Sequence, residues 1–203
     1  MDKNDLLKHI AETGYNVGFG AKLHFATYDI VDKTPGLIGF ISTAVGIFSL
    51  FINALTNNYL SATFIIIGIS GLYISFYDAT KMDYVSAGKE LTQIFNKLKR
   101  LYYRTKSAQL DELNIIETEL CDLENNYYQL AISKQILFSH WYAHYKFFWE
   151  HQIGWIEEQK KFRFFRDKIP LSFLLSVLIL ILLPLSFCLE LFEKVCSLCL
   201  KLQ

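Results

Sequence analysis

Three long runs without a charged side chain most constrain what this chain can fold into. They cover residues 36–54, 60–77 and 169–189, and none contains Asp, Glu, Lys or Arg. As α-helices, runs of about 18–21 residues are about 27–32 Å long, close to the thickness of the hydrocarbon core of a bilayer. A chain of 203 residues offers little other protein with which to bury three such helices. The runs therefore predict three membrane-spanning helices.

The distribution of basic residues predicts the orientation of these helices. Residues 78–168 carry fourteen Lys and Arg side chains, whereas residues 55–59, between the first two runs, carry none. Since basic residues concentrate on the cytoplasmic side, we expect the N-terminus and residues 79–168 to be cytoplasmic. The short 55–59 loop then lies outside and joins the first two spans into a tight helical hairpin. The side of the C-terminal tail, residues 190–203, stays open because Pro184 allows a shallow re-entrant path.

The segment before the first run, residues 1–35, carries four Lys and five acidic residues. An apolar run that begins at residue 36 behind so many charges lies too far along the chain for a cleaved secretory signal. We therefore expect residues 1–35 to form a cytoplasmic amphipathic segment and the first helix to remain as an anchor.

Residues 79–168 are expected to be helical throughout, because no Pro occurs between Pro35 and Pro170 and apolar residues recur at helical spacing. Two apolar seams consist of Leu91, Ile94, Leu98 and Leu101, and of Leu113, Ile116, Leu120, Leu123, Tyr127 and Leu130. The two seams differ in register, and the change falls near residues 105–109. This predicts an antiparallel helical hairpin or a helix of an intersubunit coiled coil. The aromatic stretch 138–165 is expected to pack against these helices.

The expected fold class is therefore an all-α membrane protein. It has an N-terminal transmembrane hairpin, a long cytoplasmic helical or coiled-coil domain, and a third, C-terminal transmembrane helix.

Small and polar side chains form rows along the first two spans. The row in the first span is Gly39, Ser42, Gly46, Ser49 and Asn53, and the row in the second is Ser61, Phe64, Gly68, Gly71, Ser75 and Asp78. Small residues allow helices to approach closely in lipid, so these rows indicate helix-packing faces. Polar groups are costly inside a bilayer, so the alternative is that Ser42, Ser49 and Asn53 line a water-filled path in a homo-oligomer.

Few residues indicate catalysis. His140, His144 and His151 recur at helical offsets, but the sequence after His140 lacks the Glu of a metalloprotease helix. Cys196 and Cys199 have redox-motif spacing without the strand–helix context of such a motif. We therefore expect no enzyme, no cofactor and no metal. Acidic and basic residues number 20 each, which argues against bulk nucleic-acid binding.

The order of these features resembles the SLATT family of small bacterial membrane effectors. The resemblance covers about residues 6–90 and includes four sequence features. These are GYNVGFGAKLHFATYDIVDK before the first span, Pro35-Gly36 at its start, the span sequence LIGFISTAVGIFSLF, and the uncharged second span. With its third span, the chain resembles a variant of the family that has an additional C-terminal transmembrane helix.

The resemblance implies an effector of a bacterial antiphage or conflict system in the inner membrane. SLATT proteins occur with nucleotide-second-messenger synthases, nucleotide-sensing domains or reverse transcriptases, and are thought to open the membrane, causing cell death or growth arrest. This implies a homo-oligomeric pore or a membrane-disrupting protein, gated through its cytoplasmic helices by a nucleotide signal or a partner protein. A cyclic oligonucleotide would meet Lys97, Lys99, Arg100, Tyr103 and Arg104, since cations bind phosphates and aromatic rings stack on bases.

Two alternatives stay open at the level of sequence. The basic stretch 97–104 is also typical of a solvated helix face or of a contact with anionic lipid. The whole chain also fits a membrane-anchored scaffold that recruits a partner through its coiled coil and conducts nothing.

Overall fold

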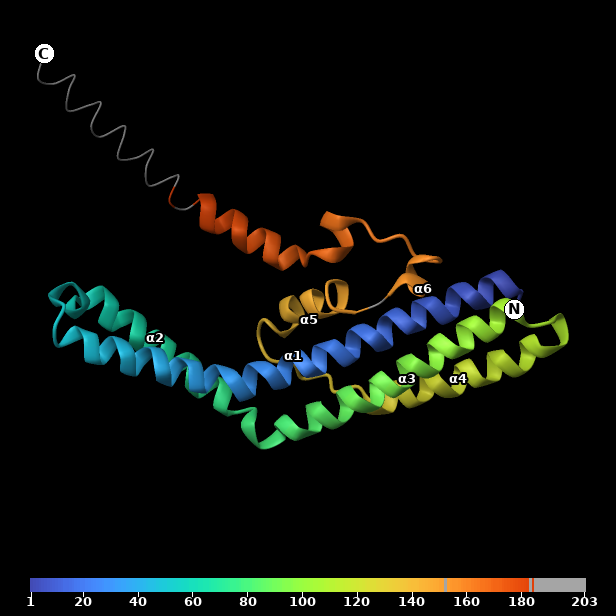
Figure 1. Ribbon diagram of the computed structural model, residues 1–203, viewed down its shortest axis with the longest axis horizontal. Helices are drawn as coiled ribbons and strands as arrows, with labels where there is room; N and C mark the ends of the chain where they lie inside the picture. The colour runs from blue at the N-terminus through green and yellow to red at the C-terminus, as the bar shows by residue number, and fades with distance from the viewer. Residues whose placement is uncertain (152, 183, 185–203) are drawn as a thin grey trace, which may run out of the picture. The chain divides into compact units, whose positions relative to one another are not determined.

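The computed structural model describes residues 1–151, 153–182 and 184, and its regular elements in these residues are all helical. The chain forms two compact units, Met1–Lys161 and Phe162–Gln203. The first unit contains helices α1 to α6, drawn from blue to orange in Figure 1.

Helix α1, Lys3–Ser49, is 47 residues long. Its N-cap is Asp2, whose side chain accepts a hydrogen bond from the Asp5 backbone N–H at 2.8 Å. This bond satisfies one of the unpaired donors at the helix start. Pro35 lies inside the helix and does not end it. The amphipathic segment and the first apolar run are therefore one continuous helix.

The two parts of α1 have opposite surroundings. The part before Pro35 has a buried face that includes Leu6, Ile10 and Val17, each 0 % exposed. The part after Pro35 leaves its large apolar side chains exposed, with Phe40 at 73 %. One helix thus contributes both to a protein core and to an open apolar surface.

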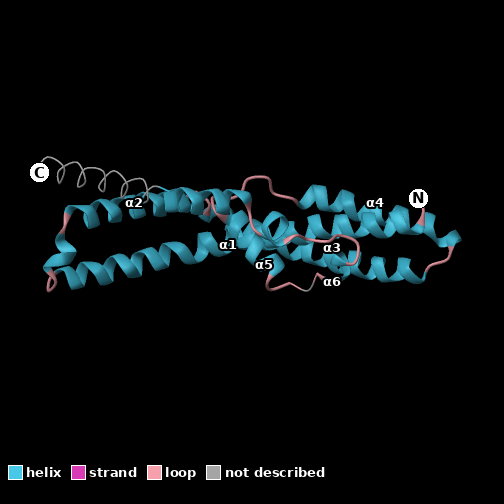
Figure 2. Ribbon diagram, turned by 90° about the horizontal axis from the view of Figure 1, so that it is seen from above, coloured by secondary structure: helices cyan, strands magenta, loops and turns pink. Residues whose placement is uncertain are grey.

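Helix α2, Asn58–Ser75, returns along the second part of α1. It begins after a short 3₁₀ turn, η1, Asn53–Thr56, and its N-cap Asn57 accepts a hydrogen bond from the Leu60 backbone N–H. Two long stretches, Lys3–Ser49 and Asn58–Ser107, each contain a window that is long and apolar enough to cross a membrane, and only 6 % of each window is buried. Figure 2 shows α2 and the later part of α1 extending away from α3 and α4.

Helices α3, Lys81–Ser107, and α4, Leu113–Leu130, form an antiparallel pair within one chain, after a short turn η2, Asp78–Thr80. Between them, η3, Leu110–Glu112, carries a capping box made by Gln109 and Glu112. The predicted seams are confirmed over most of their length. Their buried members are Leu91, Ile94, Leu98, Leu101, Leu113, Ile116, Leu120 and Leu123. Both helices contact α1 as well as each other, so the pair belongs to an intramolecular bundle.

The prediction that residues 79–168 are helical throughout is wrong. Residues 131–136, which we call the 131–136 segment, have no regular helix, and two short helices follow: α5, Ser139–Phe148, and α6, Gly154–Glu157. The physical reason is that backbone groups of the 131–136 segment bond to side chains of other helices. The Ile132 N–H, for example, donates to His24 Nε2 at 3.0 Å.

The second unit contains η4, Phe164–Lys168, and an apolar helix, Leu171–Leu182. The described helix is shorter than the predicted third span, 169–189. Residues 183 and 185–189 of that span and the tail 190–203 lie outside the described residues, and so do Cys188, Cys196 and Cys199 within them.

Candidate functional site

The first part of the site is the exposed apolar surface of α1 after Pro35 and of α2. Large side chains on it are mostly open, including Leu50 at 77 % and Leu72 at 65 %. Soluble monomers rarely expose a continuous apolar surface of this size. Such helices are stable where the surrounding medium is itself apolar, because lipid imposes no cost on exposed hydrocarbon.

Polar side chains on these two helices are satisfied locally. The Thr43 hydroxyl donates to the Gly39 carbonyl at 2.8 Å, and the Ser49 hydroxyl donates to the Gly46 carbonyl at 2.7 Å. On α2, the Ser70 hydroxyl donates to the Ile66 carbonyl at 2.9 Å. Hydroxyls bonded to a carbonyl of their own helix are less costly in lipid than unpaired ones.

The predicted rows of small residues are covered only in part. In the first row, Ser42 and Ser49 are partly buried, whereas Gly39 and Gly46 are exposed, and a Cβ at either glycine would meet nothing within 4 Å. Asn53 does not continue the row, because α1 ends at Ser49 and Asn53 begins η1.

In the second row, Gly71 faces α1, where a Cβ would lie 3.8 Å from Ile38 Cδ1. Gly68 has open space around it, and Ser75 is exposed at the end of α2. Each row therefore leaves small residues uncovered in a single copy of the chain.

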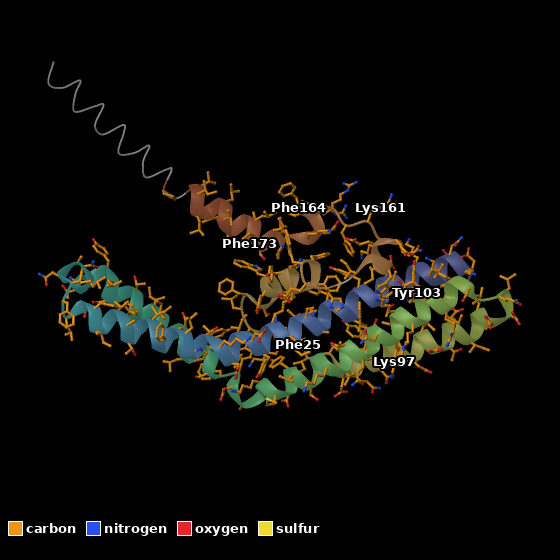
Figure 3. All side chains as sticks on the ribbon, in the orientation of Figure 1. Phe25, Lys97, Tyr103, Lys161, Phe164 and Phe173 are labelled. Carbon is orange, nitrogen blue, oxygen red and sulfur yellow. The ribbon has the colours of Figure 1, made fainter. Side chains whose placement is uncertain are left out.

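The second part of the site is the basic outer face of α3. Within the described part of the chain, Lys97, Lys99 and Arg100 form no ion pair, and together with Gln93 and Asn96 they line a depression of about 540 Å³. Figure 3 shows the side chains of α3, with Lys97 and Tyr103 labelled. Uncompensated cations in a solvent-accessible depression favour an anionic ligand.

One predicted sensing residue, Arg104, and its neighbour Tyr102 form contacts within the protein. Arg104 pairs with Glu119 of α4. Tyr102 is buried, and its hydroxyl donates to Glu158 Oε2 at 2.8 Å. Tyr103, in contrast, is 49 % exposed and available for stacking. The candidate anion site is thus formed by Lys97, Lys99 and Arg100, with Tyr103 one turn further along α3.

The three histidines do not form a common face. His140 and His144 lie on α5 beside the Phe19 ring, whereas α5 ends at Phe148 and His151 lies beyond it. No group of three or more His, Cys, Asp or Glu side chains in the described residues is arranged to hold a metal ion. Burial, together with the charges of Lys22 and Lys99, lowers the pKa of His151 to about 4.

The 131–136 segment connects α1 to the start of α3, and nothing in the sequence pattern pointed to it. His24 of α1 is 2 % exposed; its Nε2 accepts the Ile132 N–H, so its Nδ1 donates to the Gly20 carbonyl at 2.6 Å. Burial lowers the pKa of His24, which favours this neutral form. The Tyr84 hydroxyl of α3 donates to the Lys134 carbonyl at 2.6 Å. The segment is therefore fixed to both α1 and α3.

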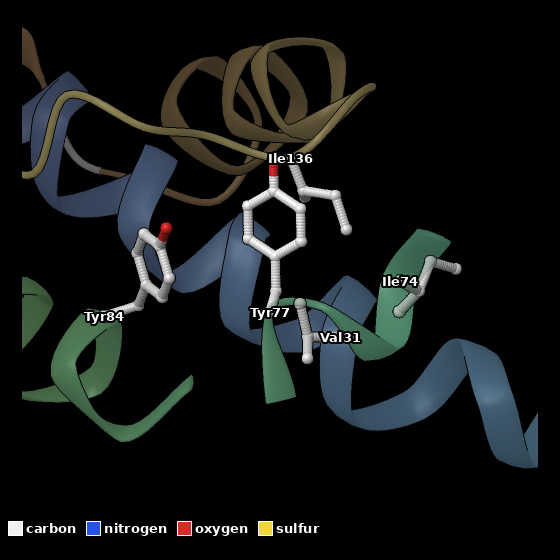
Figure 4. Close-up of a cluster of buried hydrophobic side chains, with 5 residues drawn as sticks. All are labelled: Val31, Ile74, Tyr77, Tyr84 and Ile136. Carbon is white, nitrogen blue, oxygen red and sulfur yellow. The ribbon is translucent and has the colours of Figure 1, made fainter. Parts of the chain in front are cut away.

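A buried cluster lies where α2 ends and α3 begins. It consists of Val31 from α1, Ile74 from α2, Tyr77, Tyr84 and Ile136. In Figure 4 the Tyr77 hydroxyl points toward the chain that carries Ile136, and it donates to the Gln135 carbonyl at 3.4 Å. This cluster places the end of α2 in direct contact with the bundle.

A protein family described as "SMODS and SLOG-associating 2TM effector domain 6" matches residues 1–177 of this chain. The chain belongs to the SLATT family. The match spans the apolar helices α1 and α2 and the whole α3–α6 region, well beyond the segment 6–90 that carried the sequence resemblance. SLATT members are effectors with two transmembrane helices, in agreement with the two candidate spans. No curated protein matches the chain, and no solved structure does.

Proposed function

We propose that this SLATT protein is a membrane effector of a bacterial conflict system that acts as a homo-oligomeric pore. In this proposal α1 after Pro35 and α2 cross the inner membrane as a hairpin, and residues 169–189 make a third crossing. The N-terminus and residues 79–168 are cytoplasmic. The observation that carries the proposal is the open apolar surface of α1 and α2, which continues directly from a well-packed bundle.

The continuity of α1 supports gating through the cytoplasmic helices. The same helix forms the core of the bundle before Pro35 and the candidate span after it. A movement of the bundle would be passed to the span along the helix, as in other transitions that shift packed helices. A ligand that binds one arrangement more tightly would shift the population toward an open pore.

The uncovered glycines support assembly of several copies. Gly39 and Gly46 lie two turns apart on α1 with open space beside them. In lipid, such positions let a second helix approach closely, whereas large apolar residues give little preference for a protein neighbour over lipid. The partly buried Ser42 and Ser49 then face the interior of an assembly and line its water-filled path.

Replacing both Ser42 and Ser49 with leucine is expected to abolish dye release from vesicles that contain the protein. The two substitutions remove the hydroxyls that would face water and fill the path with hydrocarbon. Fluorescence release from loaded vesicles, made with equal amounts of inserted protein, measures the effect. Resistance to alkaline extraction reports insertion separately and should not change.

The matched control is Thr63→Leu, because Thr63 of α2 also bonds a carbonyl of its own helix, at Tyr59, and lies off both small-residue rows. This variant should release dye like the unchanged protein. Equal release by all three proteins would rule out a path lined by α1. No release by any of them in the presence of a cyclic dinucleotide, with insertion intact, would favour the non-conducting scaffold.

The signal is proposed to be a nucleotide anion, such as a cyclic oligonucleotide made by an associated synthase, that binds the depression on α3. Reversing two charges, Lys97→Glu with Arg100→Glu, should weaken binding of a cyclic dinucleotide by tenfold or more, because charged hydrogen bonds contribute about 1.5–3 kcal/mol each. Isothermal titration calorimetry at two salt concentrations measures this. Lys89→Glu, also on the exposed surface of α3, serves as control, and equal weakening by it would indicate a general charge effect.

A further inference from the structure

An apolar pocket lies where α1 and α2 leave the bundle. Its volume is about 330 Å³, within the range of small-molecule sites. Three segments line it: Ile30, Thr34 and Ile38 of α1; Ser70, Tyr73 and Ile74 of α2; and Ile136, Leu137 and Phe138. The α1 residues recur every four positions and so form one stripe of the helix.

The pocket offers few free polar groups to a ligand. The Ser70 hydroxyl is already bonded to the Ile66 carbonyl, and the Tyr73 hydroxyl lies 3.4 Å from the Tyr77 hydroxyl. Most of the remaining lining is hydrocarbon. An unpaired polar group placed there would lose its hydrogen bonds to water, which is costly. The pocket therefore suits an apolar ligand.

Phe138 lines the pocket and forms what we call its lid, and the backbone of this residue is strained. Phe138 has φ 68°, the only positive φ outside glycine in the described residues. A bulky side chain in this left-handed region costs of order 1–3 kcal/mol, and such outliers cluster at ligand clamps and other functional sites. Phe138 is also 54 % exposed and its neighbour Leu137 is 61 % exposed. The backbone thus holds two apolar side chains outward at the mouth of an apolar pocket.

The surface around the pocket indicates what occupies it. Of the lining residues, Ile38 is half-buried and Ser70 is exposed, and their chain neighbours Leu37 and Ile69 belong to the exposed apolar surface. The pocket therefore borders the medium that surrounds α1 and α2. We infer that an acyl chain of a membrane phospholipid occupies the pocket, held between α1, α2 and Leu137–Phe138. This inference rests on the proposed insertion of α1 and α2 into the bilayer.

The bound chain would contact the residues that connect the spans to the bundle. Ile74 and Ile136 line the pocket and also belong to the cluster with Val31, Tyr77 and Tyr84. An occupied pocket therefore stabilises the packing of the end of α2 against the 131–136 segment. Its loss would loosen the contact through which the bundle acts on α2.

Trp141 provides a natural reporter, since its ring centroid lies 4.8 Å from that of Phe138. Phospholipid with bromine on an acyl chain should quench Trp141 in a saturable way when added to the detergent-solubilised full-length protein. The Trp141→Phe variant gives the background from the other tryptophans. Ser70→Phe fills the pocket and should remove most of the saturable quenching.

Thr63→Phe is the matched control, because both hydroxyls are exposed on α2 and bond a carbonyl four residues earlier, but Thr63 does not line the pocket. It should be quenched like the unchanged protein. A second variant, Phe138→Gly, accepts the positive φ without strain and removes the lid, so it should also lose saturable quenching.

Equal saturable quenching in the unchanged protein, Ser70→Phe and Phe138→Gly would overturn the inference, as would quenching that rises without saturation. Alkaline extraction of membranes separates this failure from failure of the proposed function. If the protein is inserted but shows no saturable quenching, only the lipid site is wrong. If the protein is released from membranes, the proposed function fails as well.

Discussion

Replacing Gly14 with alanine is expected to lower the melting temperature of the protein, whereas the same change at Gly20 raises it. A Cβ at Gly14 would lie 2.3 Å from Trp155 Cη2, closer than real contacts allow. Trp155 has little freedom to move, because it is 3 % exposed and packs against the rings of Phe95 and Tyr102. Overpacking of a core in this way costs about 1–3 kcal/mol.

At Gly20 the nearest atom to a Cβ is Tyr127 Cε2 at 3.4 Å, an ordinary contact. Alanine is favoured over glycine inside a helix by about 1 kcal/mol, so Gly20→Ala should stabilise α1. One kcal/mol corresponds to about 2–4 °C for a chain of this size. Circular dichroism of the solubilised protein measures both changes. If both variants raised the melting temperature, the tight packing of α6 on α1 would be refuted.

Gly18, one turn further along α1, is also closely approached by aromatic rings. A Cβ at Gly18 would lie 2.7 Å from the Phe95 ring and 2.9 Å from the Phe147 ring. Gly14 and Gly18 are therefore the positions at which α1 accepts the aromatic side chains of α3, α5 and α6. Since both glycines contact Phe95 or its neighbour Trp155, their effects should not be additive.

Much of the helical packing could be predicted from the sequence. An apolar residue at every third or fourth position defines one face of a helix, so the seams at 91–101 and 113–123 directly identified buried residues. The absence of charge likewise identified the two helices whose apolar side chains are exposed. Both features are local, and a single sequence is sufficient to recognise them.

Features that depend on distant partners could not be predicted. The 131–136 segment contains no Gly or Pro that would stop a helix, and it is extended because its backbone bonds to His24 and Tyr84. Gly14 and Gly18 gave no signal either, since a glycine does not indicate which side chain approaches it. The partner of Gly14, Trp155, is far away along the chain.

The candidate anion site could be predicted only in part. A basic stretch on α3 was evident, but charges in a sequence do not show which of them are already paired. Arg104 pairs with Glu119, which lies beyond the α3–α4 turn, whereas Lys97 and Arg100 form no ion pair within the described part of the chain. Similarly, helical spacing placed Asn53 on the first span, but the helix ends four residues earlier.

Lowering the pH from 7.5 to 4.5 is expected to destabilise the bundle by about 1–2 kcal/mol through His151 alone, because solvent screens the charge of this half-buried ring and reduces its effect. Its ring lies 4.7 Å from the Phe95 ring centroid and 6.0 Å from that of Phe147. Burial and the nearby charges of Lys22 and Lys99 lower its pKa from 6.5 to about 4. Above pH 6.5 the ring is neutral in both states and stability is complete. As the pH falls toward 4, the unfolded chain binds a proton that the folded protein does not, so stability is lost.

Between pH 7.5 and pH 4.5 the expected loss of stability comes from the histidines and not from the carboxylates whose pKa values are lowered. For Asp29, burial raises the pKa, but hydrogen bonds from Lys146 and Lys33 hold it below 3.8. A hydrogen bond from Lys106 holds the pKa of Glu158 below 4.5. Stability from a lowered carboxylate pKa is lost only below its unfolded value, so neither group contributes above pH 4.5. His24, whose pKa is also lowered by burial, adds to the loss in the same direction.

The His151→Gln variant should therefore lose much less stability than the unchanged protein between pH 7.5 and pH 4.5, as measured by denaturant unfolding of the solubilised protein. Lys99→Gln tests the cause, because removing that charge allows the pKa of His151 to rise and reduces the loss. Lys97→Gln, two residues away on the same helix, is the control, since Lys97 does not contribute to the lowered pKa. Identical pH profiles for His151→Gln and the unchanged protein would mean that His151 is not held neutral against the aromatic rings of the bundle.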